Sequence, residues 1–285
     1  MASSALAVYV QANGRSRKLH PAICEGIDAA GDRFEEMPDE QYRGNLGHHS
    51  TIVFYGYENK TPQIMRDAIA AGKKVVFVDL GYWGRREGGR YRGYHKVAIN
   101  ARHPTEYIQR LYGFDVPRER RIVPLIHPWK QPGKNILLAG MSERAANSIG
   151  FQANEWELKT IERIRKYTDR PIIYRAKPSW RGATPLPGTR FDGTPTIKAS
   201  LESCHIVVSH HSNVCCDALF LGVPVYCEDS AAKPMGIDDI AKIETPVRPE
   251  NRDEWMRALS WCQFSVAEIR SGFMWSTLKK QGLIS

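Results

Sequence analysis

Short runs of β-branched and aromatic residues alternate along the chain with amphipathic segments of helical spacing. In the first half of the chain, this pattern predicts strands at 6–10, 51–55, 74–79 and 121–125, and helices at 21–30, 62–71 and 104–112. Proline opens each of these helices and glycine follows the last two, which is the expected order of helix signals. Such an alternation is typical of an α/β domain with a parallel sheet.

The alternation restarts after 127–134, a segment with two prolines and a glycine that we interpret as a linker. The pattern then predicts strands at 135–139, 171–175, 205–208 and 223–227, and helices at 155–167, 196–203, 213–221, 252–262 and 266–280. We therefore expect two Rossmann-like lobes, 1–128 and 129–262, followed by a helical segment, 263–285. Because open α/β sheets bind ligands at the carboxyl ends of their strands, we expect the active site in a cleft between the lobes.

The segment 206–226 is the most informative part of the sequence. A buried apolar strand ends at Ser209, a small polar turn follows, and a helix starts there with Ser212 or Asn213 as its N-cap. Backbone N–H groups and the dipole at such a helix start favour a phosphate, and His211 adds a hydrogen-bond donor. The plainest alternative is an ordinary strand–helix–strand unit with a capped helix.

The order of strand, His-x-Ser turn, acidic residue before Ala-Leu and Gly-Val-Pro-Val resembles the donor-binding lobe of GT-B glycosyltransferases over 135–232. The resemblance implies that Ser212 and Asn213 hold the phosphates of a nucleotide-sugar and that Asp217 binds the ribose hydroxyls, a position where the family more often has Glu. It also implies that the C-terminal helix, 263–285, packs back on the N-terminal lobe. Nucleotide-sugar epimerases of the same fold carry the same motif.

Further donor-binding candidates follow other strands of the second lobe. Arg175 and Lys177 stand two residues apart at a strand end, so they face the same side and can clamp a diphosphate leaving group. Gly140 and Ser142 suit a close approach of the backbone to the donor, and Arg144 supplies a further cation. Glu228 is a candidate for binding the sugar hydroxyls. For Arg175 and Lys177, a pair of solvated edge charges is the alternative. The loop with Gly140 is a weak signal by itself.

Sugar transfer needs a group that accepts the proton of the acceptor hydroxyl. Asp79 ends the strand 74–79 and therefore lies at a carboxyl end, which makes it our first candidate for this base. His210 is a second candidate, contributed by the donor lobe. A structural or capping role is the alternative for Asp79.

The composition is globular, with 285 residues that are 42% hydrophobic and 25% charged, which excludes a disordered chain. The formal net charge is +9, and segment 82–134 holds twelve Lys and Arg residues against four Asp and Glu residues. Nearly all of the excess charge therefore lies in this segment. It indicates a polyanionic partner or a basic surface.

The acceptor-binding candidates come from the basic segment and from a loop expected after the first strand. Guanidinium groups among aromatic rings suit a nucleic-acid backbone with exposed bases. A solvated loop or a lid over the donor is the alternative. The candidates are Arg15, Arg17, Tyr82, Trp83, Arg85, Arg86, Arg90 and Arg92.

Several classes of protein are not indicated. No apolar run approaches the length of a membrane helix, and the start reads as a strand without the basic leader of a signal peptide. The six cysteines form no CxxC pair and no Cys/His spacing suited to zinc, so we expect reduced thiols, no metal site and a cytoplasmic location. A P-loop and a GxSxG elbow are also missing.

These observations favour a metal-independent glycosyltransferase that needs no cofactor and uses a nucleotide-sugar, such as a UDP-sugar, as co-substrate. A hydroxymethylated pyrimidine in DNA is one candidate acceptor, as in the phage DNA glucosyltransferases, and a capsular or surface glycan is another. A nucleotide-sugar epimerase and a non-catalytic nucleic-acid-binding protein remain open as alternatives.

Overall fold

The computed structural model describes residues 5–11, 14–85, 93–113, 124–178, 180 and 182–285, without the side chains of 14–18. The chain forms two units, of which unit 1 contains Met1–Ile122 and Ala258–Ser285 and unit 2 contains Val123–Arg257. All six cysteines are buried free thiols. Within the described residues, no helix has the length and apolar character needed to cross a bilayer.

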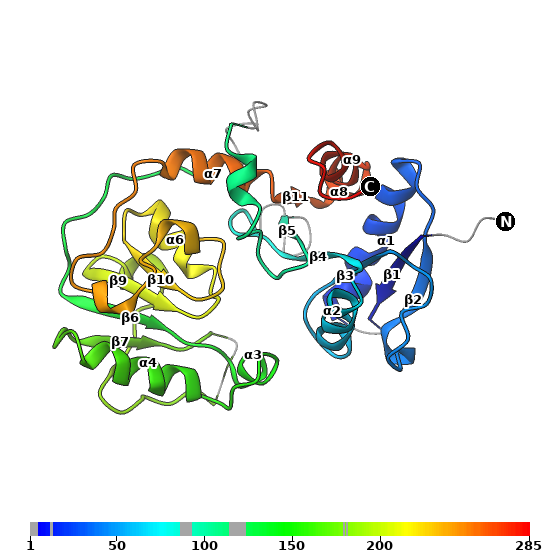
Figure 1. Ribbon diagram of the computed structural model, residues 1–285. Helices are drawn as coiled ribbons and strands as arrows, with labels where there is room; N and C mark the ends of the chain where they lie inside the picture. The colour runs from blue at the N-terminus through cyan, green and yellow to red at the C-terminus, as the bar shows by residue number, and fades with distance from the viewer. Residues whose placement is uncertain (1–4, 12–13, 86–92, 114–123, 179, 181) are drawn as a thin grey trace. The chain divides into compact units, whose positions relative to one another are not determined.

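Unit 1 is built on a six-stranded sheet with the order β11-β5-β4-β3-β1-β2 (Figure 1). Strands β1 to β4 are parallel, whereas β5 runs antiparallel to β4 and β11 runs antiparallel to β5. The sheet strands are β1 (Leu6–Val10), β2 (Glu35–Pro38), β3 (Thr51–Tyr55), β4 (Lys74–Leu80), β5 (Tyr94–Ile99) and β11 (Gln263–Ser265).

Helices cover the sheet of unit 1. Helix α1 follows β1 and α2 follows β3, so the right-handed crossovers place them on opposite faces. On the α2 face, Phe54 and Phe77 from the sheet pack with Ile64 and Met65 from the helix. The helices are α1 (Gly14–Ala29), α2 (Thr61–Ala70), α8 (Val266–Arg270) and α9 (Phe273–Lys280), with short 3₁₀ turns η1 (Asp39–Gln41) and η2 (Ile108–Leu111).

The C-terminal helices pack on α1, as the resemblance implied (Figure 1). Gly26 allows the contact, because a Cβ atom added there would lie 1.9 Å from the carbonyl oxygen of Ile269. Arg270 pairs with Glu25 across the same contact at 2.6 Å. The close approach of the two helix backbones therefore fixes the C-terminal segment on unit 1.

Unit 2 is built on a five-stranded sheet with the order β10-β9-β6-β7-β8, in which every pair is parallel. Its strands are β6 (Asn135–Ala139), β7 (Ile172–Arg175), β8 (Arg190–Phe191), β9 (Cys204–Ser209) and β10 (Val225–Cys227). Its helices are α3 (Glu143–Asn147), α4 (Glu155–Arg165), α5 (Ile197–Ser200), α6 (Val214–Phe220) and α7 (Arg252–Ser260). The last three residues of α7 belong to unit 1. Two short 3₁₀ turns are η4 (Lys233–Met235) and η5 (Ile240–Lys242). In chain order this is the doubly wound arrangement of nucleotide-binding domains.

A buried ion pair ties the end of β7 to the segment after β8. The Nη1 atom of Arg175 lies 2.7 Å from Oδ2 of Asp192, and the same Nη1 donates to the hydroxyls of Thr194 and Ser200. The side chain of Asp192 is 2% exposed. Burial alone would raise the pKa of this carboxyl, but hydrogen bonds from Ser200, Arg175 and Thr194 outweigh burial and hold the pKa below its usual value.

Several elements differ from the sequence-based expectation. The helix expected at 21–30 starts at Gly14 and holds Pro21 in its interior. The helix expected at 104–112 is only the 3₁₀ turn η2. The helix expected at 266–280 is divided into α8 and α9 at Gly272, whose φ is 79°. Strands β2, β5, β8 and β11 were not expected, and most of the strand expected at 121–125 lies outside the described residues.

We expect Gly26→Ala to lower the free energy of unfolding by about 1–3 kcal/mol, because the added methyl group must push α1 away from α8. Denaturant unfolding measures the loss. Gly193→Ala is the matched control, because its added methyl group meets nothing within 4 Å. An unchanged or increased stability of Gly26→Ala would show that the two helices do not approach this closely.

We expect Asp192→Asn to lower the free energy of unfolding at neutral pH by about 2–3 kcal/mol. Since the folded pKa of Asp192 is lowered, its stabilising effect is present above the unfolded pKa and is lost as the pH falls from about 4 through the folded pKa. Unfolding curves across this pH range should therefore converge for wild type and variant. Asp238→Asn, which removes an exposed pair with Lys242, is the control and should change little. Parallel curves would contradict the assignment.

Candidate functional site

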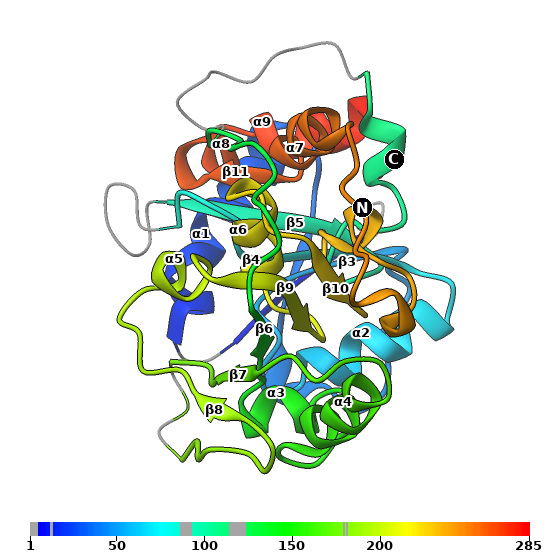
Figure 2. The same ribbon diagram turned by 90° about the vertical axis from the view of Figure 1, so that its left-hand side faces the viewer.

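The candidate ligand site of unit 2 lies where the chain leaves two neighbouring parallel strands. β6 and β9 pair in register up to Ala139 and Ser209. The strands that follow them in the chain, β7 and β10, lie on opposite sides of this pair (Figure 2). Because the connections diverge, the loops that start at Gly140 and His210 leave the same edge side by side. Open α/β sheets bind their ligands at such a position.

The loop after β6 passes close to the neighbouring strand. The N–H of Gly140 donates to the carbonyl of Arg175, and a Cβ atom added to Gly140 would lie 2.5 Å from the ring of Tyr174. The next N–H, of Met141, donates to Oε1 of the buried Glu157 at 2.6 Å. Burial raises the pKa of Glu157, although this N–H acts in the opposite direction. Glycine is therefore required at 140, and a buried carboxylate holds the loop in place.

Three other predicted donor-binding residues lie around this loop. Ser142 is the N-cap of α3 and accepts a hydrogen bond from the N–H of Ala145 at 3.4 Å. Arg144 has an exposed side chain on α3, and Lys177 is exposed beyond the end of β7. Both cations thus reach solvent near the carboxyl edge of the sheet.

The turn after β9 is held by two serine hydroxyls. Oγ of the buried Ser209 accepts from the N–H of Ser212 at 2.9 Å, and Oγ of Ser212 accepts from the N–H of Val214 at 3.2 Å. Asn213 stands at the N-cap of α6 and makes no side-chain capping bond. Asp217 is half-buried in α6. The structure therefore gives Ser212 a role in shaping the turn.

His210 stands at the centre of the carboxyl edge. Its ring packs edge-on against Phe151 and Trp156, with centroid distances of 5.9 Å and 5.6 Å. Its Nδ1 lies 3.2 Å from Nδ1 of His211, and its Nε2 lies 3.7 Å from Oε2 of Glu228. The side chain is 13% exposed. His210 is thus fixed by aromatic neighbours and placed beside a carboxylate.

Arg163 of α4 completes this cluster and was missed by the sequence analysis. Its Nη1 lies 3.2 Å from Oε1 of Glu228, and its Nη2 donates to the hydroxyl of Tyr226 at 3.1 Å. Burial alone would lower the pKa of Arg163, but Tyr226 and Glu228 together hold it above its usual value. The main-chain oxygen of His210 accepts from the N–H groups of Glu228 and Asp229, at 3.1 Å and 2.8 Å. The loops after β9 and β10 are thereby joined.

Two arginines of unit 2, Arg175 and Arg163, differ in their surroundings. Nη1 of Arg175, predicted as a diphosphate clamp, is held in the buried network around Asp192. Arg163 lies in the His210 cluster with a side chain that is 43% exposed. Arg163 and Glu228 are 65 residues apart in the chain, so only the three-dimensional fold reveals their pairing. The structure therefore makes Arg163 a better-placed cation than Arg175.

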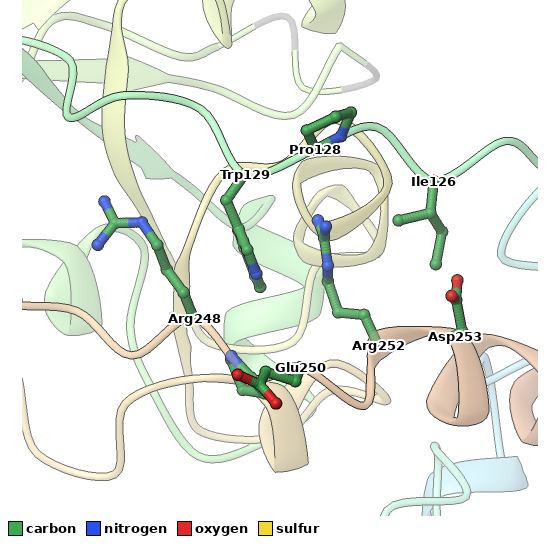
Figure 3. Close-up of a pocket in the computed structure, with 8 residues that line it drawn as sticks. Ile126, Pro128, Trp129, Arg248, Glu250, Arg252 and Asp253 are labelled. Carbon is green, nitrogen blue, oxygen red and sulfur yellow. The ribbon is translucent and has the colours of Figure 1, made fainter.

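A separate cavity of about 470 Å³ in unit 2 is lined by Trp129, Arg248 and Arg252 among others (Figure 3). The guanidinium of Arg252 lies 3.7 Å from the centroid of the Trp129 ring and donates to the carbonyls of Leu219 and His127. These contacts lie at the C-terminal end of α6, away from the edge where α6 begins. Arg252 joins chain segments there, so we place the candidate ligand site at the carboxyl edge.

Asp79 lies near the end of β4 in unit 1, as expected. Its side chain is half-buried, and its Oδ1 accepts from the N–H of Leu80 at 2.8 Å. Its register partner on β5 is Lys96, which is buried and lies over the rings of Phe77 and Tyr82. Asp79 thus stands at a carboxyl end with one oxygen turned to its own backbone.

The acceptor-binding prediction needs correction at Tyr82. Its ring is fully buried, its hydroxyl lies 3.3 Å from Nδ1 of His103, and its N–H donates to Gln263. A ring inside the core of unit 1 cannot stack on a nucleic-acid base. Trp83 is half-buried, and Arg85 donates from Nε and Nη2 to the carbonyl of Tyr82.

The other acceptor-binding candidates are only partly described. Arg15 and Arg17 belong to the first turns of α1, and not to the loop that was expected. Their side chains lie outside the described part of the chain, as do Arg86, Arg90 and Arg92 entirely. The basic-loop hypothesis therefore stays a prediction.

A cavity of about 640 Å³ lies at the carboxyl ends of β2 and β3 in unit 1, and the sequence analysis missed it. Asp39 lines it and is 2% exposed, with no hydrogen-bond partner for Oδ2 among the described residues. Burial raises the pKa of Asp39, while the N–H groups of Lys60 and Glu40 act in the opposite direction. Asn59 lines the same cavity with a left-handed φ of 52°. A buried carboxylate with an unpaired oxygen is suited to a hydroxyl ligand.

None of the protein-family models matches the chain, and neither does any curated protein sequence. Among solved structures, the beta Kdo 2,7 transferase of Thermosulfurimonas dismutans KpsC is similar, with 14% identity and a TM-score of 0.55 over 94% of this chain and 98% of that chain. The beta Kdo 2,4 transferase of the same KpsC is similar, with 11% identity and a TM-score of 0.51 over 90% of this chain and 91% of that chain. This likeness, together with the two sheets, shows an α/β fold with two Rossmann-like lobes of the GT-B type.

Proposed function

We propose that this protein is a glycosyltransferase that moves a sugar from a nucleotide-sugar, such as a UDP-sugar, to a hydroxyl acceptor. The fold is that of two sugar transferases, which supports the reaction class. The observation that carries the proposal is the convergence of His210, Glu228 and Arg163 at the carboxyl edge of unit 2. This edge is where a doubly wound sheet takes its ligand.

The cluster supplies groups of the kinds that a departing nucleoside diphosphate needs. Cleavage of the bond between the sugar carbon and the phosphate oxygen leaves an electron pair on that oxygen. Arg163 and the exposed Lys177 supply positive charge for the phosphates, and His210 can donate a hydrogen bond to the departing oxygen. Glu228 positions both Arg163 and His210. Asp217 keeps its predicted role at the ribose.

The acceptor hydroxyl loses a proton as its oxygen bonds to the sugar carbon. We assign this proton to Asp79, which stands at a carboxyl end of the unit 1 sheet. The cavity lined by Asp39 lies at the carboxyl ends of the same sheet and offers carboxylate, amide and cationic groups for acceptor hydroxyls. Asp39 is therefore a further candidate for the base, in addition to Asp79 and His210.

We favour an acidic glycan as the acceptor. Such a polymer is a polyanion, which agrees with twelve Lys and Arg residues against four Asp and Glu residues in 82–134. The core position of Tyr82 removes one of the aromatic rings on which the DNA hypothesis depended. The alternative acceptor is DNA that contains a hydroxymethylated pyrimidine.

Calorimetric titration with CDP, UDP, GDP and dTDP tests the donor site, and we expect one of them to bind. Mass spectrometry of acidic oligosaccharides and of hydroxymethylcytosine-containing duplex DNA, each incubated with a mixture of nucleotide-sugars, then tests the acceptor. We expect the oligosaccharide to gain a sugar. If none of the nucleotides binds, the enzyme hypothesis is wrong. If only DNA gains a sugar, the proposal of an acidic glycan as the acceptor is wrong.

The roles of the charged groups are separable by substitution. We expect His210→Ala to lower the transfer rate about 100-fold or more, and Glu228→Gln to lower it about tenfold because the two groups it positions lose their partner. Asp79→Asn should lower the rate about 100-fold without weakening nucleotide binding. Glu202→Gln, exposed at the amino end of β9, is the control. If Asp39→Asn loses activity while Asp79→Asn keeps it, the base is Asp39.

A further inference from the structure

The strongest cluster of metal-ligating side chains lies outside the proposed sugar-transfer site. His20, Cys24 and Glu36 each offer one ligand atom, and the three atoms all lie within 4.8 Å of one another. His20 and Cys24 come from α1, and Glu36 comes from β2, the strand at the edge of the unit 1 sheet. The cluster thus connects a helix with an edge strand.

The helix places two of the ligands on one face. His20 and Cys24 are four residues apart, so their side chains lie on consecutive turns of α1. The sequence analysis missed this pair because it expected the helix to begin at Pro21. Since Pro21 lies inside the helix, His20 belongs to the same continuous element as Cys24.

The distance between the ligand atoms of the two helix residues matches that of a tetrahedral site. Bonds of about 2.0–2.3 Å to a zinc ion separate its ligand atoms by about 3.3–3.6 Å. Nε2 of His20 lies 3.4 Å from Sγ of Cys24, within that range, and 2.7 Å from Oε2 of Glu36. The side chain of Glu36 is 58% exposed, so it can rotate by the remaining fraction of an ångström.

The surroundings favour a metal ion with one open position. His20 and Cys24 are 8% and 9% exposed, whereas Glu36 reaches solvent. Nitrogen, thiolate sulfur and carboxylate oxygen are the ligands that zinc takes in proteins, and three of them leave the fourth position for water. The second cluster, Glu35 with His48 and His49, has two exposed members and no sulfur.

We propose that His20, Cys24 and Glu36 bind a zinc ion that fastens the edge strand β2 to α1. Glu35 and Glu36 are consecutive on β2. Glu35 bonds to His49 in the segment before β3, and Glu36 bonds to His20 of α1. Within the described part of the chain, this four-residue strand pairs only with β1, so a metal clamp would contribute much of its attachment. The strand leads directly into Asp39, so the ion would also steady one wall of the unit 1 cavity.

Metal titration of the reduced, chelator-treated chain tests the site independently of sugar transfer. With cobalt(II), we expect the charge-transfer absorption of a cobalt–thiolate bond, saturating at about one equivalent. Zinc, measured by competition with a chromophoric chelator, should displace the cobalt. We expect Cys24→Ser, His20→Gln and Glu36→Gln each to weaken zinc binding at least about tenfold.

Two control variants separate this site from its alternatives. Cys262→Ser removes another buried thiol of unit 1, and Glu35→Gln removes the acid of the second cluster; both should bind zinc as the wild type does. Zinc at a fixed concentration should raise the unfolding temperature of the wild type and of both controls more than that of Glu36→Gln. Glu36 is exposed, so misfolding is a poor explanation for a smaller shift in this variant. The proposal is overturned if the wild type shows no thiolate band, or if Cys24→Ser and Glu36→Gln bind zinc as tightly as the wild type does.

Discussion

The parallel pairing of β6 with β9 is the constraint on which the candidate site depends. Since crossovers between parallel strands are right-handed, chain segments that continue to β7 on one side and to β10 on the other must leave this pair in opposite directions. The two connections therefore diverge from the carboxyl ends of β6 and β9. Gly140 and His210 follow directly at this edge, so residues distant in the sequence become neighbours there.

Buried charge divides the polar residues of unit 2 into structural and accessible groups. Asp192 is almost fully buried and has Arg175 as its ion-pair partner, so this pair secures the end of β7. Glu228 is partly exposed and contacts both Arg163 and His210. Because Glu228 reaches solvent, Arg163 and His210 can move toward a ligand without leaving the carboxylate as an isolated buried charge. A phosphate arriving at this edge would meet Arg163 beside a carboxylate. That arrangement fits reversible binding of an anion better than the sealed network around Arg175.

The sequence predicted the strands that carry the site because apolar runs such as β9 are buried on both faces. It also predicted His210 and Glu228, since both directly follow strands. It failed where local signals competed with tertiary packing: Pro21 reads as a helix start, yet the packing of α1 keeps it inside the helix. The sequence did not predict Arg163 and Asp39 for another reason. Arg163 pairs with a carboxylate that is distant in the chain, and Asp39 lines a cavity formed by two separate segments.

Hydrogen–deuterium exchange with and without a saturating nucleoside diphosphate tests the central claim most directly, because it locates the bound ligand along the chain. We expect slower exchange in the loops that follow β6, β9 and β10, which contain Gly140, His210 and Glu228. Protection confined to 126–130 and 248–253, around the cavity of Trp129 and Arg252, would contradict it, because the ligand would then bind away from the carboxyl edge.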